Sequence, residues 1–208
     1  ETINKYLNSK TEHALLINGK WGSGKTYYIK NKLQELIESP IEWQIIYTSG
    51  NGINDFKEIL DQIFTQKYLK NITKNRLPRI ALSLLKAGTA AGLKFLNLED
   101  NAGIDRFDLL FNLENSILII DDIERINFNR LHISDFLGTI NNSFTEQSNI
   151  KVILLTDEEQ LYKILNTETD KYKLIKEKTI WRTINFKFDF EPAFKSFVKD
   201  LPCNNDIK

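Results

Sequence analysis

The sequence contains no methionine and a single cysteine, Cys203, among its 208 residues. One thiol excludes a disulfide framework within the chain and a zinc cluster of several cysteines, and it is typical of a protein from a reducing compartment. We therefore expect a cytoplasmic location. Because an initiator methionine is also missing, we expect these residues to be a piece of a longer protein, and the start at Glu1 does not have the pattern of a secretory signal.

The sequence also has few histidines and no net charge. The two histidines, His13 and His132, provide too little material for a histidine-based metal site or a Ser-His-acid triad. Twenty-eight Lys and Arg residues balance 28 Asp and Glu residues, so no overall field attracts the molecule to nucleic acid or to a membrane surface. With 41% hydrophobic and 27% charged residues, the composition excludes a disordered or fibrous chain.

Long uncharged apolar runs are absent too. The segment from Leu77 to Leu98 is rich in leucine and alanine, but Arg79, Lys86 and Lys94 interrupt it. A membrane-spanning helix needs about 20 predominantly apolar residues, so membrane attachment is not expected. We predict a helical insertion over residues 77–113 instead.

Charge is unevenly distributed in this region. Seven basic residues and no acid occur over the stretch 62–98, whereas eight acids and one arginine follow over 99–124. Such blocks favour solvated faces of neighbouring helices over a phosphate-binding surface. The second interpretation would make nucleic acid a partner, through the basic segment 67–94.

Short apolar runs alternate with stretches of helical period, which predicts an α/β three-layer sandwich with a mostly parallel sheet of about five strands. The expected buried strands are His13–Ile17, Trp43–Tyr47, Ile117–Ile120 and Lys151–Leu155. A fifth, more alternating strand at 179–188 is expected at a sheet edge. Apolar helical stripes occur at 29–37, 56–64 and 133–144. We predict one domain over 1–190, followed at 191–208 by the start of a truncated helical element.

A phosphate-binding motif follows the first predicted strand and precedes the first helical stripe. The residues satisfy the pattern G-x-x-x-x-G-K-[ST] and are Gly19, Lys20, Trp21, Gly22, Ser23, Gly24, Lys25 and Thr26. Glycines allow the backbone to turn so that successive N–H groups point at phosphate oxygens, and the following helix adds its positive end. Lys25 would reach the β- and γ-phosphates, and Thr26 would offer its hydroxyl to Mg²⁺. The alternative is a glycine-rich turn that only joins strand to helix.

Two adjacent carboxylates follow the third apolar run. Asp121 is the predicted magnesium residue, because ligands bind at the carboxyl ends of strands in open α/β sheets. Asp122 is the predicted acid that orients the attacking water, with Glu124 as the alternate. If this hypothesis is right, Asp121 must point towards Thr26. The alternative is a helix start after a strand, where Asp is common.

Further polar positions are candidates for catalysis or recognition. Thr156 ends a predicted strand and would sense the γ-phosphate or hold the water, unless it is a helix cap. Arg125 would neutralise charge in its own or a neighbouring subunit, unless it only pairs with a nearby acid. Arg182 is a weaker candidate of the same kind. Trp21 would stack on a base or pack against the adjacent helix.

The loop motif, with tryptophan before its central glycine, together with Asp121-Asp122-Ile123-Glu124-Arg125, resembles the KAP family of P-loop NTPases. The family's second motif commonly reads Asp-Asp-Leu-Asp-Arg, so Glu124 is a departure. The resemblance implies an ASCE-type sheet with an extra strand between the P-loop strand and the metal-binding strand. It also implies ATP with Mg²⁺, nucleotide-dependent self-assembly or control of a partner protein, and kinship with NTPase switches of bacterial antiviral defence.

We therefore expect an ATPase that works as a conformational switch. One alternative is a nucleotide-holding interaction module with negligible turnover. Another is an ATPase stimulated by nucleic acid through the segment 67–94, for which the salt dependence of stimulation would be diagnostic.

Overall fold

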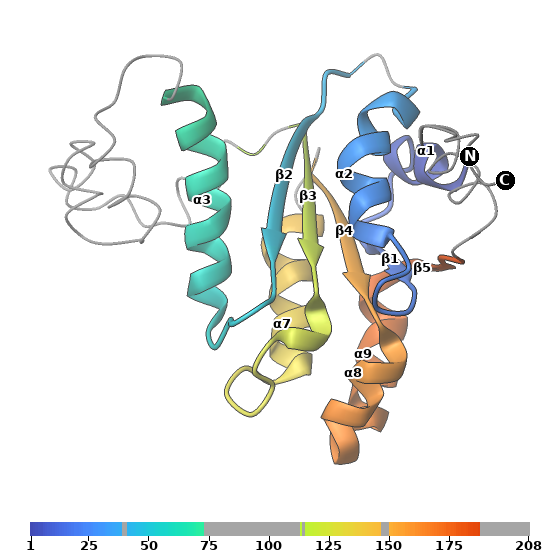
Figure 1. Ribbon diagram of the computed structural model, residues 1–208, viewed down its shortest axis with the longest axis vertical. Helices are drawn as coiled ribbons and strands as arrows, with labels where there is room; N and C mark the ends of the chain where they lie inside the picture. The colour runs from blue at the N-terminus through green and yellow to red at the C-terminus, as the bar shows by residue number, and fades with distance from the viewer. Residues whose placement is uncertain (39–40, 73–112, 114, 147–149, 188–208) are drawn as a thin grey trace, which may run out of the picture.

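Five parallel strands form one sheet in the computed structural model, which describes residues 1–38, 41–72, 113, 115–146 and 150–187 (Figure 1). The strands are β1 (Ala14–Asn18), β2 (Gln44–Ser49), β3 (Ser116–Asp121), β4 (Ile150–Thr156) and β5 (Ile180–Asn185). Their spatial order is β2-β3-β4-β1-β5, and every pairing is parallel. The predicted parallel sheet of five strands is confirmed, and the fifth strand lies at an edge as expected.

Helices cover both faces of this sheet, which confirms the three-layer sandwich (Figure 1). On one face lie α1 (Thr2–Leu7) and α2 (Lys25–Leu36). The other face is covered by α3 (Phe56–Ile72), α7 (Ile133–Ile140), α8 (Glu158–Leu165) and α9 (Thr169–Thr179). Three short helical turns complete the described elements, namely η2 (Ile123–Arg125), η3 (Asn141–Thr145) and η4 (Asn166–Glu168).

Side-chain alternation along the central strands explains the two hydrophobic layers. In β3, Ile117 and Ile119 pack towards α2, whereas Leu118 and Ile120 pack towards α7. Every residue of β3 and β4 is buried, because helices cover both faces of these strands. The edge strands β2 and β5 are more exposed, which agrees with their mixed polar and apolar sequences.

The strand order brings the sequence motifs to one edge of the sheet. In space β4 lies between β1, which precedes the glycine-rich loop, and β3, which ends at Asp121. This is the extra strand that the family resemblance implies, whereas β2, which comes between the two motifs in the sequence, lies at the sheet edge. Parallel strands all end at the same side, so the glycine-rich loop and the segment that follows β3 lie at the lower end of the sheet in Figure 1.

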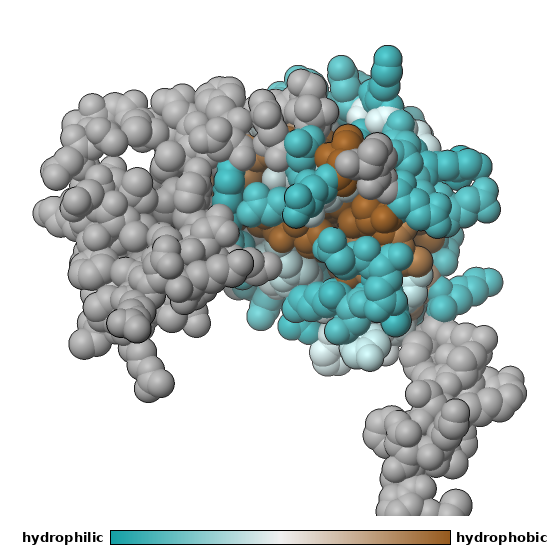
Figure 2. All heavy atoms as spheres, turned by 90° about the horizontal axis from the view of Figure 1, so that it is seen from above, coloured by the Kyte–Doolittle hydropathy of each residue, from teal (hydrophilic) through white to brown (hydrophobic). Residues whose placement is uncertain are grey.

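Figure 2 looks onto the end at which the strands begin, and hydrophobic side chains gather there between hydrophilic ones.

In the described part of the chain, no helix is both long and apolar enough to cross a membrane. The predicted insertion at 77–113, apart from the buried Leu113, lies outside the described residues, as does the predicted element at 191–208.

Gly50 follows β2 and packs closely against the turn after β3. Its N–H donates to the carbonyl of Asp121 at 2.7 Å, and a Cβ at Gly50 would lie 2.8 Å from the carbonyl oxygen of Asp122 and 2.7 Å from Cγ1 of Ile126. Only a residue without a side chain fits here unless the backbone moves. The small residue therefore lets β2 and the turn that carries the second motif approach each other.

We predict that Gly50→Ala lowers the free energy of unfolding by about 1 to 3 kcal/mol, since the new methyl group overlaps backbone atoms of the turn. The matched control is Gly138→Ala in α7, where a Cβ meets nothing within 4 Å. A helical glycine is less favourable than alanine, so this control should gain about 0.5 to 1 kcal/mol. Urea unfolding of both variants measures the difference, and equal effects would contradict the prediction.

Candidate functional site

The glycine-rich loop between β1 and α2 adopts a conformation that depends on its glycines. Gly22 and Gly24 have φ angles of 74° and 86°, a region that disfavours side chains, and Gly24 is the N-cap of α2. The N–H of Gly19 donates to the carbonyl of Thr156 at 3.0 Å, which ties the start of the loop to β4. The first amides of α2 have no acceptor within the helix, and they are available to an anion at its positive end.

Lys25 closes this loop from inside. The side chain is buried, and its ammonium donates to the carbonyl oxygen of Gly19 and, at 3.1 Å, to that of Lys20. A buried cation is therefore held directly beside the amides of the loop. This combination of N–H donors and one ammonium is suited to an anion with several oxygens, such as a polyphosphate.

Thr26 contacts the predicted magnesium residue. Its Oγ1 donates to Oδ2 of Asp121 at 2.6 Å, although the two residues belong to α2 and β3. The other carboxylate oxygen, Oδ1, accepts the N–H of Asp122 at 2.8 Å. Hydroxyl and carboxylate oxygens are the ligands that Mg²⁺ prefers, so the two side chains fit this ion.

Tyr47 of β2 joins the same cluster, and the sequence motifs did not identify it. Its hydroxyl donates to Oδ2 of Asp121, and the ammonium of Lys30 lies 3.8 Å from the centre of its ring. Burial, and secondarily the hydrogen bond to Asp121, raise the pKa of Tyr47 above its ordinary value. The phenol therefore keeps its proton and acts as a donor. The only feature of the sequence that pointed to Tyr47 was its place as a polar aromatic residue near the end of a predicted strand.

Asp122 has a different environment from its neighbour. Its backbone is left-handed, with φ of 54°, and its carboxylate is partly exposed. The Arg125 Nε atom lies 3.9 Å from Asp122 Oδ1, and the guanidinium of Arg125 lies 5.3 Å from the ring centre of Trp21. Trp21 is 73% exposed, so it does not pack against the adjacent helix as one interpretation of the sequence had it.

Glu124 turns away from Asp122 and into the protein. It is buried, and its Oε2 accepts the hydroxyl of Thr156 and the N–H of Asp157, both at 3.1 Å. The two candidate acids after β3 thus take separate positions, one partly exposed and one bound to the end of β4. Thr156 is not a helix cap, because its hydroxyl is directed at Glu124 and the N-cap of α8 is Asp157.

Asp157 is a further residue that the motifs did not identify as part of the site. One carboxylate oxygen accepts the N–H groups of Glu159 and Gln160, which caps α8, and the other accepts the N–H of Trp21 at 2.9 Å. This single buried side chain thus fixes α8 to the glycine-rich loop. The helix-start pattern at 156–159 indicated that a helix is capped here, but a local pattern cannot predict a contact with the distant loop.

A cavity of about 520 Å³ adjoins the loop on the side of β5. Loop residues Gly19, Lys20 and Ser23 line it together with Asn18 and the end of β5. The side-chain amide of Asn18 donates to Oδ1 of Asn185 at 2.9 Å, which holds the two strand ends together. Within the described part of the chain, the buried hydroxyl of Ser23 has no hydrogen-bond partner.

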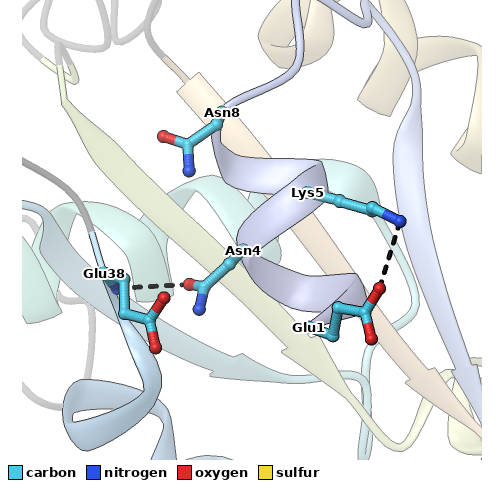
Figure 3. Close-up of a pocket in the computed structure, with 5 residues that line it drawn as sticks. All are labelled: Glu1, Asn4, Lys5, Asn8 and Glu38. Atoms are coloured by element: carbon cyan, nitrogen blue, oxygen red, sulfur yellow. Dashed lines mark hydrogen bonds and ion pairs between the residues drawn. The ribbon is translucent and has the colours of Figure 1, made fainter.

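Other candidates lie away from this cluster. Arg182 is exposed on β5, three residues before the strand ends, and its guanidinium lies 5.0 Å from the ring centre of Trp181. Most of the basic segment 67–94 lies outside the described residues. A polar cavity of about 560 Å³ is lined by Glu1, Asn4, Lys5, Asn8 and Glu38 (Figure 3). It lies beside α1 and beyond the far end of α2, so it is separate from the loop.

A family model described as the KAP family P-loop domain matches residues 1–207. The chain therefore belongs to this family and is a P-loop NTPase domain. The match agrees with the loop and with the second motif as the structure presents them. Comparison with curated proteins finds no match.

Solved structures of similar fold include Cdc6p from Pyrobaculum aerophilum, with 19% identity and a TM-score of 0.51 over 94% of this chain and 45% of that chain. The Aeropyrum pernix ORC2 protein, in its ADPNP-ADP complexes, has 15% identity and a TM-score of 0.51 over 88% of this chain and 44% of that one. This chain spans less than half of the length of either protein. At these identities the comparisons establish the fold alone.

We predict that Asp157→Ala lowers the free energy of unfolding by about 1 to 2 kcal/mol, since it removes the cap of α8 and leaves the N–H of Trp21 without its acceptor. The matched control is His132→Ala at the N-cap of α7, where the side chain makes no capping hydrogen bond. Its effect should stay below about 1 kcal/mol, since the contact of His132 Nδ1 with Glu168 Oε1 at 3.4 Å is a surface pair. Urea unfolding compares the two, and an Asp157→Ala variant as stable as the control would contradict the assigned contacts.

Proposed function

We propose that this domain binds ATP together with Mg²⁺ and hydrolyses it, and that the cycle of binding and hydrolysis operates a conformational or oligomerisation switch. The observation that carries the proposal is the 2.6 Å hydrogen bond from Thr26 to Asp121. It holds two oxygen ligands side by side at the end of a loop whose N–H groups and Lys25 ammonium would bind an anion. A loop that served only as a turn would not require a buried lysine or a carboxylate from another strand.

The cavity beside the loop supports a nucleotide rather than a smaller phosphate compound. It opens from Gly19 and Ser23 towards the end of β5, and its volume of about 520 Å³ is in the range of small-molecule sites. We assign it to the nucleoside. The Asn18 and Asn185 side-chain amides, which line this cavity, would supply polar contacts. The structurally similar Aeropyrum pernix ORC2 protein has been solved in ADPNP-ADP complexes, which is in keeping with this assignment.

Hydrolysis would use Asp122 as the acid that orients water. Its carboxylate is partly exposed beside the loop, so a water molecule can reach it. In the proposed step, the water oxygen attacks the γ-phosphorus, the bond to the bridging oxygen breaks, and ADP departs with that electron pair. Asp122 accepts the proton of the water. Mg²⁺ held by Thr26 and Asp121 would neutralise charge on the β- and γ-phosphates.

Glu124 and Thr156 fit the role of a sensor better than that of a base. Both acceptor contacts of Glu124 lead to the end of β4, and Asp157 continues the connection to the backbone of Trp21. A change at the γ-phosphate that moved Thr156 or the loop would therefore reach α8. Arg125, over the ring of Trp21, lies where it would respond to the same change or meet a second subunit.

We propose that the ATPase acts as a switch that controls self-assembly or a partner protein. The family resemblance favours bacterial antiviral defence as the setting of this switch. The alternative is a module that holds nucleotide with negligible turnover. Phosphate release measured at high protein concentration decides between them, because a module that only holds nucleotide releases no phosphate beyond one equivalent.

We predict that Lys25→Ala abolishes binding of ATP, since it removes the buried ammonium from the loop. The control is Lys32→Ala, an exposed lysine of α2 that pairs with Glu35. Equilibrium binding of a fluorescent ATP analogue with Mg²⁺ compares the variants. If Lys25→Ala bound as tightly as Lys32→Ala, the proposed site would be wrong.

We also predict that Asp122→Asn leaves ATP binding intact and lowers kcat by a factor on the order of 10² to 10⁴, the usual contribution of a positioned acid or base. Glu124→Gln should lower kcat less, because one amide oxygen can still accept both hydrogen bonds that Oε2 of Glu124 accepts. Single-turnover phosphate release separates the two acids. The reverse ranking would transfer the role of water-orienting acid to Glu124.

A further inference from the structure

We propose that Tyr47 is a positioning residue for the metal site. Its hydroxyl holds the Asp121 carboxylate in the orientation that leaves the hydroxyl of Thr26 ready to bind Mg²⁺. The proposal rests on the proposed function, since it assumes that the pair binds a nucleotide-associated Mg²⁺. It assigns a role in the site to β2, an edge strand that carries neither of the sequence motifs.

The geometry gives the Asp121 carboxylate three donors from three directions. Oδ2 accepts the hydroxyls of Thr26 and Tyr47, while Oδ1 accepts the N–H of Asp122. The hydroxyl of Thr26 comes from α2, the phenol from β2 and the amide from the residue that follows β3. A carboxylate bound by a side chain of α2, a side chain of β2 and the N–H of the next residue cannot rotate without breaking at least one of these bonds.

The orientation of the carboxylate decides what the hydroxyl of Thr26 can do. A threonine hydroxyl has one proton and two lone pairs, and here the proton is donated to Asp121. Its lone pairs are therefore left for a cation. If Asp121 turned away, the proton of Thr26 would seek another acceptor and its lone pairs would no longer be fixed. The phenol thus acts on the metal through Asp121, as outer-shell hydrogen bonds do at metal sites.

Tyr47 is itself held in place on both sides of its ring. Its strand pairs with β3 in register, with Tyr47 opposite Ile119. The ring joins the hydrophobic cluster beneath α2, and the ammonium of Lys30 lies against it at 3.8 Å. Packing therefore fixes the direction of the hydroxyl, so that its contact with Asp121 does not depend on a flexible side chain.

The test is Tyr47→Phe, which removes only the hydroxyl. Affinity for a fluorescent ATP analogue is measured in EDTA and during titration with Mg²⁺. We expect unchanged affinity in EDTA, and a concentration of Mg²⁺ for half-maximal tightening that rises about tenfold, the low end of losses caused by outer-shell changes. A loss of equal size with and without Mg²⁺ would overturn the proposal, because it would reveal a general structural effect.

The matched control is Tyr172→Phe. This tyrosine is also buried and also donates its hydroxyl to a carboxylate, that of Glu158 at 2.7 Å, but it lies on α9. Its Mg²⁺ dependence should equal that of the unchanged protein. If the unchanged protein itself shows no Mg²⁺ effect, the proposed function fails. If it does and Tyr47→Phe matches it, only this inference fails.

If Tyr47→Phe does not fold, the double variant that combines Tyr47→Phe with Asp121→Asn still tests the proposal. The amide of asparagine carries no charge and needs fewer donors than the carboxylate does. Should Tyr47→Phe fail to fold, the double variant is expected to fold, as shown by circular dichroism. A double variant that also fails to fold would assign Tyr47 to packing and overturn the proposal.

Discussion

One hydrogen bond, from the hydroxyl of Thr26 to the carboxylate of Asp121, defines the site because it joins two segments that are neither neighbours in sequence nor adjacent in the sheet. β4 lies between the strands that deliver them. Such a contact requires β1, which leads into the P-loop, and β3 to end at the same level. The parallel sheet, buried on both faces over β3 and β4, provides this condition, since its hydrophobic packing fixes the register of each strand.

The interposed strand β4 has a second consequence. Its last residue, Thr156, contacts Glu124, and the next residue, Asp157, contacts the backbone of Trp21 and caps α8. The end of β4 is therefore bound to both motifs at once. A rearrangement in the loop would therefore reach α8, so a P-loop NTPase domain of this architecture has a structural route from the loop to the helices on the far side of the sheet.

Several elements followed directly from the sequence and others did not. Strands β1, β3 and β4 were recognisable because each is a short apolar run, and the helices α2, α3 and α7 because their apolar residues recur at helical spacing. The short α1 and the largely polar α9 lack a comparable pattern, although each buries a tyrosine, Tyr6 and Tyr172. Their helical state depends on what they pack against. Trp21 and Thr156 were each open to two interpretations, and the choice between them required contacts from distant segments.

By itself the sequence determined the α/β class and the P-loop, and it predicted the site residues Lys25, Thr26, Asp121 and Asp122, because each of these depends on local spacing and on the end of an apolar strand. Only the tertiary structure decided that Glu124 faces Thr156, that Tyr47 contacts Asp121, and that Asp157 binds the backbone of Trp21. The physical reason is that hydrogen-bond partners are chosen by strand order and register, which bring together groups separated by 32 to 136 positions in the chain.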